Sequence, residues 1–156
     1  MKLFKRISLF MVLCLSLVGL TGCGSKNVEG SLEDIMTKLY QDIPQDERPM
    51  LANTKVNEEN IEYYLGIKDI KYTEALASEP MMSSIAHSVV LVRVEDNANI
   101  EEVKTAIKEN VDPRKWLCVG VEKEDLIVKN KGNLVVLIMV EDEATRNKLE
   151  EGFNNL

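Results

Sequence analysis

Residues 134–140 read LVVLIMV, seven consecutive apolar side chains, and this stretch decides the fold. Successive side chains of a strand point to opposite faces, so an uninterrupted apolar run must be covered on both faces of its sheet. Residues 89–92, VVLV, repeat the pattern earlier in the chain. We therefore expect two central strands of one sheet, over residues 85–95 and 134–140.

Helical spacing and capping residues predict helices on either side of these strands. The predicted helices cover residues 31–43, residues 57–65 with Gly66 as the stop, a segment from residue 100, and a last helix after residues 141–143 with Leu149, Phe153 and Leu156 inward. Weaker strand patterns lie at residues 69–78, 116–121 and 126–129, and the segment 130–132 is a turn signal. Residues 44–55 hold two prolines and predict a loop.

These elements predict an α+β fold with one domain over residues 31–156. Its sheet is antiparallel or mixed, has four or five strands in two ββα halves, and is covered by the N-terminal helices. The two halves are similar in sequence. Residues 89–96 (VVLVRVED) are identical to residues 135–142 (VVLIMVED) at six of eight positions, 46 residues apart. Duplication and convergence on a buried strand followed by a capped helix both explain this similarity.

The composition places limits on function. The chain has 156 residues, of which 45% are hydrophobic and 29% charged, which excludes disordered and collagen-like classes and leaves room for one core. The net charge is −7, and residues 1–22 hold three basic side chains and no acid, so residues 23–156 carry −10. An acidic surface of this strength argues against nucleic-acid binding.

The N-terminus has the architecture of a signal peptide over residues 1–22. Basic residues 1–6 precede an apolar run over residues 7–20, which is shorter than the ~20 residues that a spanning helix needs. An uncleaved anchor helix is the alternative. Leu20, Thr21, Gly22 and Cys23 resemble the lipobox of bacterial lipoproteins.

The lipobox resemblance implies cleavage before Cys23, a diacylglycerol on its thiol, and a palmitate-type acyl chain. Two acyl chains anchor a protein stably. We expect residues 23–30 to be the lipidated cysteine and a short linker, and the protein to lie on the outer face of the cytoplasmic membrane. The membrane is then one partner and a protein of the cell envelope a possible second, with the oligomeric state left open.

Two residues could form a catalytic pair. His87 is the only histidine, and Cys118 is the only free thiol once Cys14 is removed and Cys23 is acylated. A cysteine-dependent hydrolase or transferase using both is therefore the enzymatic alternative. However, Cys118 lies in an apolar, strand-like run (WLCV), so we expect it to be buried, unreactive and independent of His87.

No cofactor and no metal site is expected. One histidine and one thiol are too few for a zinc site, and the acidic clusters at residues 122–125 and 141–143 lack the spacing of a calcium loop. The candidates for recognition are Tyr63 and Tyr64, Met81 and Met82, and Trp116. We expect Trp116 in the core and the two methionines exposed; whether they form a contact patch is left open by the sequence.

Residues 31–142 resemble an uncharacterised family of Firmicutes lipoproteins with a single domain of unknown function. The segments that carry the resemblance are AHSVVL (86–91), DPRKWLCV (112–119), KGNLV (131–135) and IM (138–139). The resemblance implies a compartment but no reaction. We therefore expect a membrane-anchored, non-catalytic binding or assembly module; a solute receptor would need two lobes and a longer chain.

Overall fold

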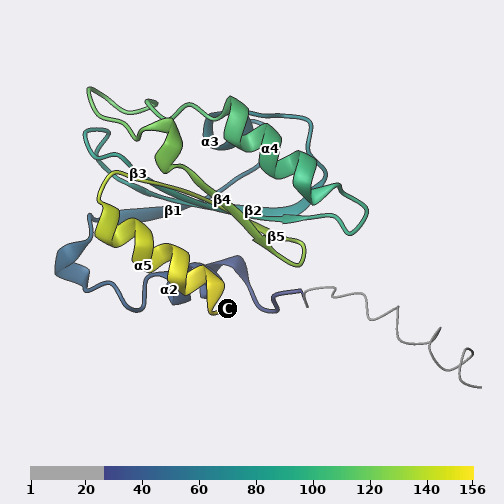
Figure 1. Ribbon diagram of the computed structural model, residues 1–156, viewed down its shortest axis with the longest axis horizontal. Coiled ribbons are helices and arrows are strands. Elements are labelled where there is room, and N and C mark those ends of the chain that lie inside the picture. The colour runs from purple at the N-terminus through teal and green to yellow at the C-terminus, as the bar shows by residue number, and fades with distance from the viewer. Residues whose placement is uncertain (1–26) are drawn as a thin grey trace, which may run out of the picture.

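Five antiparallel strands form one sheet in the order β1-β2-β3-β5-β4 (Figure 1). The computed structural model describes residues 27–156. The strands are β1 (Leu51–Lys55), β2 (Tyr72–Pro80), β3 (His87–Val94), β4 (Ile127–Lys131) and β5 (Leu134–Val140). The helices are α2 (Leu32–Leu39), α3 (Ile61–Leu65), α4 (Ile100–Asn110) and α5 (Glu143–Asn154), with short 3-10 turns at Gln45–Glu47 and Lys123–Asp125. The predicted α+β class is confirmed.

The centre of the sheet is the pair of apolar strands β3 and β5. They pair along their full length, from His87 opposite Val140 to Arg93 opposite Leu134. Every residue of β5 is buried, as is every residue of β3 except Arg93. Both faces of these strands are therefore packed, as the apolar runs require.

Two apolar layers cover the two faces of the sheet (Figure 1). Helices α3 and α4 pack against one face through Leu65 and Ile107, in a layer that also holds Val90 and Leu137. Helices α2 and α5 pack against the other face through Ile35 and Phe153. We call these the α3/α4 layer and the α2/α5 layer.

Three of the four predicted helix starts agree with the observed caps, whereas the helix expected over residues 57–65 begins only at Ile61, because residues 58–60 form a turn before it. Ser31 Oγ accepts a hydrogen bond of 3.1 Å from the Asp34 amide, and Asp142 accepts one of 2.8 Å from the Thr145 amide. The Asn99 side chain caps α4 in the same way. These side chains satisfy amides that the first turn of a helix leaves without an intrahelical partner.

Three sequence expectations differ from the structure. The predicted loop at residues 44–55 contains β1, whose side chains are mostly exposed, so no apolar pattern marks this edge strand. Residues 116–121 form a loop rather than a strand; Trp116 is buried there, and the Val121 amide bonds to the Pro113 carbonyl. The N-terminal helices do not share one face, because α2 and α3 belong to opposite layers.

The two ββα halves have opposite hands. In each half the first strand lies outside the second, and β3 and β5 run antiparallel. Rotation about the normal to the sheet superimposes the strands but leaves α4 and α5 on opposite faces. Matched residues such as Val89 and Val135 likewise face different layers. This geometry favours convergence over duplication as the origin of the sequence similarity.

Gly66 provides a test of how α3 docks on α4. It ends α3 with φ +72°, and a Cβ atom there would lie 2.3 Å from the carbonyl carbon of Asn110. We expect Gly66→Ala to lower the free energy of unfolding by about 2 to 4 kcal/mol, combining backbone strain and overpacking. Urea unfolding measures this. Gly30→Ala is the control, because Gly30 also has positive φ but has no atom within 4 Å of the added Cβ; an equal or larger loss there would contradict the docking argument.

Candidate binding surface

A groove of about 880 Å³ lies between the end of α2 and the edge strand β1. Its apolar lining includes Met36, Tyr40, Ile43, Met50 and Leu51. Its polar lining includes Gln41, Asp46, Arg48, Asn53 and Ser78. The groove exists because α2 contacts β2 and leaves the neighbouring strand β1 uncovered on this face.

Tyr40 and Ser78 line this groove, and a buried polar contact lies behind them. The Tyr40 hydroxyl and Nε2 of His87 share a hydrogen bond of 2.8 Å. Burial raises the pKa of Tyr40 and lowers the pKa of His87 to about 4. His87 is therefore neutral at physiological pH. The Arg48 guanidinium lies over the Tyr40 ring, 5.4 Å from its centroid.

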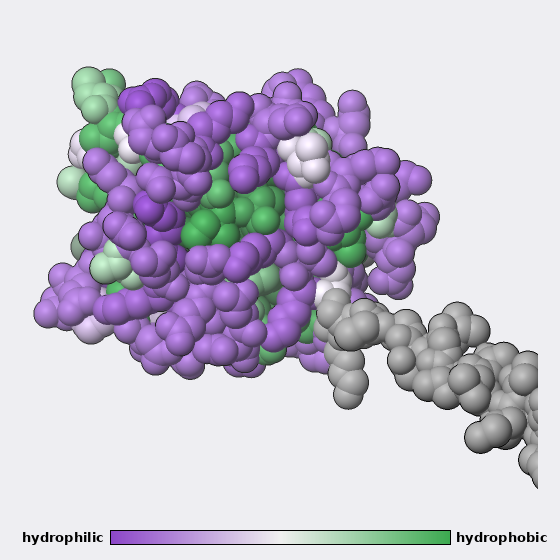
Figure 2. Space-filling view, in the orientation of Figure 1, coloured by the Kyte–Doolittle hydropathy of each residue, from purple (hydrophilic) through white to green (hydrophobic). Residues whose placement is uncertain are grey.

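Exposed apolar side chains gather at the same end of the sheet. Met50 is 77% exposed and Met81 is 71% exposed, and the Met81 amide donates to the Met50 carbonyl. Met82 and Leu117 are exposed beside them, and the Leu117 amide donates to the Ser83 carbonyl. Figure 2 shows apolar residues at the upper left end of the molecule, in addition to a patch near the centre of this face. The predicted exposure of Met81 and Met82 is confirmed.

The other recognition candidates, Tyr63, Tyr64 and Trp116, surround Lys115, and Tyr63 among them stays 50% exposed. Lys115 is 3% exposed in its side chain, pairs with Glu79 at 2.5 Å, and lies 4.5 Å from the centroid of the Tyr63 ring. Its ammonium also faces the rings of Tyr64 and Trp116. Burial lowers the pKa of Lys115, and the Glu79 carboxylate opposes that shift. The cluster fastens the loop after α4 to β2, and Trp116 is in the core as predicted.

The expected burial of Cys118 is wrong. Cys118 is exposed, with φ +62°, in the loop after Trp116. The apolar run gave a wrong prediction because it forms a loop in which Trp116 and, in part, Val119 pack on the core while Leu117 and Cys118 point to solvent. The structure also does not bring Cys118 to His87: His87 contacts Tyr40 in the α2/α5 layer, whereas Trp116 packs in the α3/α4 layer.

The acidic clusters have local structural partners. Glu122 pairs with Arg114, Asp125 pairs with Arg146, and Asp142 caps α5. Across residues 27–156 no group of three or more histidine, cysteine or acidic residues is arranged to hold a metal ion. Within the same residues no helix is long and apolar enough to cross a bilayer.

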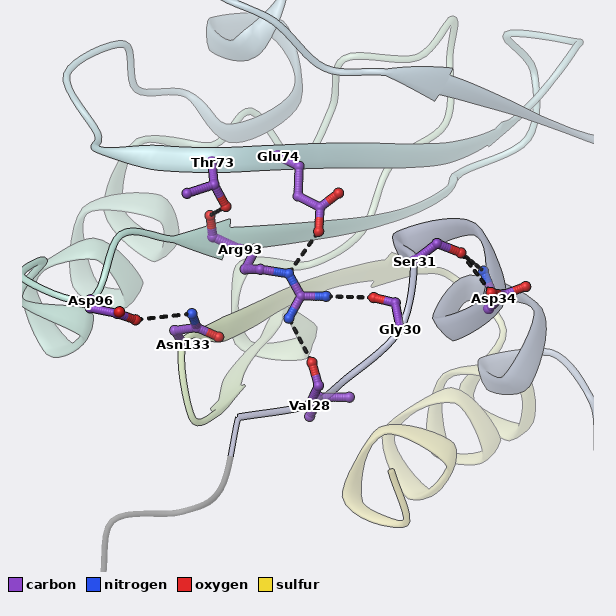
Figure 3. Close-up of polar contacts among 9 residues, drawn as sticks. All are labelled: Val28, Gly30, Ser31, Asp34, Thr73, Glu74, Arg93, Asp96 and Asn133. Carbon is purple, nitrogen blue, oxygen red and sulfur yellow. Dashed lines mark hydrogen bonds and ion pairs between the residues drawn. The ribbon is translucent and has the colours of Figure 1, made fainter.

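The start of the described chain is bound to the opposite end of the sheet (Figure 3). Arg93 donates to the carbonyls of Val28 at 2.6 Å and Gly30 at 2.9 Å, while its Nε pairs with Glu74. The Asn133 amide donates to the Asn27 side chain. The part of the expected linker at residues 27–30 is therefore held on the domain. The signal peptide and the lipobox residues Leu20, Thr21, Gly22 and Cys23 lie outside the described residues.

A family model, "Domain of unknown function (DUF4358)", matches residues 48–140. The chain belongs to the DUF4358 family. The matched segment of the DUF4358 domain runs from Arg48 in the groove through β5 and leaves α2 and α5 outside. The expected domain of unknown function is thus confirmed, while its assignment to Firmicutes lipoproteins stays a prediction. No curated protein and no solved structure matches this chain.

The buried His87 predicts a pH-dependent stability. The folded protein keeps His87 neutral down to pH about 4, whereas the unfolded chain binds a proton near pH 6.5. Unfolding therefore takes up a proton between these values. We expect the free energy of unfolding to fall by up to about 3 kcal/mol as the pH drops from 6.5 toward 4. Urea unfolding at several pH values measures this, and His87→Gln should flatten the curve; an unchanged curve would contradict it.

Exposure of Cys118 predicts rapid alkylation of the native protein. Cys118 should react with a maleimide at close to the rate of the urea-unfolded chain, because its thiol is exposed and not packed. His87→Ala should leave the native rate unchanged, since His87 is buried against Tyr40 whereas the Cys118 thiol is on the surface. Mass spectrometry after short labelling times measures both rates. Protection of the thiol, or a slower rate in the His87 variant, would contradict the structure.

Proposed function

We propose that this protein is a lipid-anchored lipoprotein on the outer face of the cytoplasmic membrane, with a DUF4358 domain that acts as a non-catalytic binding or assembly module. The anchor is Cys23, in the lipobox of residues 20–23. The observation that carries the proposal is the position of residue 27. Bound to the turn between β4 and β5, it lies only four residues after Cys23.

This short connection supports a defined orientation. Four residues span at most ~14 Å, so the end of the sheet that carries Arg93 and Asn133 is held close to the bilayer. His87 and Arg93 lie six residues apart on β3, a distance of ~20 Å along the strand. The groove and the exposed methionines belong to the His87 end. The proposed anchor therefore presents them to the envelope space rather than to lipid.

The character of this outer end supports binding rather than catalysis. Its groove combines apolar side chains with a cation, Arg48, and with Tyr40, whose hydroxyl bonds the neutral His87 behind it. Exposed methionines adapt to varied partners and are enriched at interfaces. The enzymatic alternative, a hydrolase or transferase using Cys118 and His87, has no comparable support, because His87 is buried against Tyr40 whereas Cys118 lies on the surface in the loop after Trp116.

Metabolic labelling with a fatty-acid analogue tests the anchor. We expect the wild-type protein to be labelled and recovered with membranes, and Cys23→Ala to be unlabelled and retained as precursor. Cys118→Ala is the matched control: it removes the other cysteine of the mature chain and should be labelled like wild type. Labelling that survives Cys23→Ala, or an unlabelled wild-type protein, would reject the proposal.

A further inference from the structure

The two edges of the sheet are covered differently. At β4, α4 reaches one face through Lys104, which donates to Asn130, and α5 reaches the other through Glu150, which pairs with Lys129. At β1, four of the five residues are exposed, and the groove beside α2 lies against one face. An edge strand without cover offers unpaired backbone groups to another chain. Of the two edges, β1 is the more accessible to a further strand, because every residue of β4 is half-buried.

The register of β1 against β2 shows which backbone groups of β1 are not bonded to β2. The Met81 amide donates to the Met50 carbonyl, and the Val56 amide donates to the Ala75 carbonyl. Hydrogen-bonded pairs alternate in an antiparallel ladder, so Ala52 and Thr54 bond to β2. The amides and carbonyls of residues 51, 53 and 55 consequently point away from β2. The Lys55 carbonyl already accepts a hydrogen bond of 3.2 Å from the Asn60 side chain, so a sixth strand would use the amides of residues 51, 53 and 55 and the carbonyls of residues 51 and 53.

The same residues turn their side chains toward the groove. Asn53 lies opposite Ser78 and Lys55 lies opposite Leu76, and both partners contribute to the α2/α5 side of the sheet. A strand added to β1 would place alternate side chains on that side. Those side chains would extend the apolar lining formed by Met36, Ile43 and Leu51.

The charged residues around the groove indicate which side chains the added strand would carry. Arg48 lies over the Tyr40 ring, and among the described residues no carboxylate forms an ion pair with it. Asp46, on the rim of the groove, is the acidic residue in its lining. Stacking orients the guanidinium before a ligand arrives, and a guanidinium binds carboxylates through paired hydrogen bonds. Lys55 adds a second cation at the end of β1.

We infer that the β1 edge and its groove bind an extended segment of an envelope protein, which adds a strand to the sheet and places an acidic side chain on Arg48. This inference rests on the proposed role as a binding module. Main-chain hydrogen bonds to β1 would provide affinity, and the groove would select alternate side chains. A second copy is disfavoured as occupant, because two such domains anchored in one membrane point their grooves the same way.

Photo-crosslinking in cells tests the occupant. The full-length chain carries p-benzoylphenylalanine in place of Met50, which lines the groove and is exposed. We expect cross-links to one short segment of another envelope protein, identified by mass spectrometry as alternating and containing Asp or Glu. The same photoreactive residue in place of Leu117, exposed at the same end but in the loop after α4, should not cross-link to that segment.

Two substitutions test the mode of binding. Asn53→Pro removes an outward amide and spares the bonds to β2, and Arg48→Gln removes the charge. Each should reduce cross-linking at least about tenfold, as expected for loss of one charged or main-chain contact. Lys38→Gln, on an exposed position of α2, is the control and should leave cross-linking unchanged. Thermal unfolding verifies the fold, and Arg48→Gln remains informative if Asn53→Pro unfolds.

The outcomes test the groove inference and the lipid anchor independently. Cross-links to lipid, to a second copy or to a segment without acidic residues would overturn the inference. So would absent cross-links, or cross-links unaffected by both substitutions. Fractionation of the same cells reports the anchor independently. Wild-type protein found with membranes but without the cross-link rejects the groove alone, whereas cross-linked protein found outside membranes rejects the lipoprotein role alone.

Discussion

Pairing of β3 with β5 is the constraint on which the rest of the structure depends. Both strands are apolar on both faces, so each face of the sheet needs its own layer of side chains. The chain meets this requirement by sending α4 to one face and α5 to the other after two similar hairpins. The opposite hands of the two halves follow from this division, and so does the placement of α2 beside α5.

Antiparallel pairing also gives the domain two different ends. β3 begins at His87, beside Tyr40, and its Arg93 holds the carbonyls of residues 28 and 30. One end of the sheet is thus tied to the incoming chain, while the other carries the groove and the exposed methionines. A short connection to a membrane would hold the Arg93 end near the bilayer, so the groove at the His87 end would face away from it.

The groove itself results from uneven cover. Helix α2 is only eight residues long and contacts β2, so the face of β1 is left open. The buried Tyr40–His87 contact behind the groove is neutral, and the Arg48 guanidinium stacked on Tyr40 supplies positive charge. An apolar groove with one positioned cation beside free backbone groups is suited to an extended, acidic peptide segment.

The central strands, the starts of three helices and the end of α3 could be predicted from the sequence, because these depend on apolar runs and on residues adjacent in the chain. Ser31, Asn99 and Asp142 each act within three residues. The exposure of Met81 and Met82 followed in the same way from a proline-containing loop. The tertiary structure alone decided the rest. An exposed edge strand such as β1 has no apolar period, so only its pairing with β2 reveals it. The side of the sheet that each helix covers, the exposure of Cys118 and the contact of Tyr40 with His87 across 47 positions depend on packing between distant segments, which no local pattern encodes.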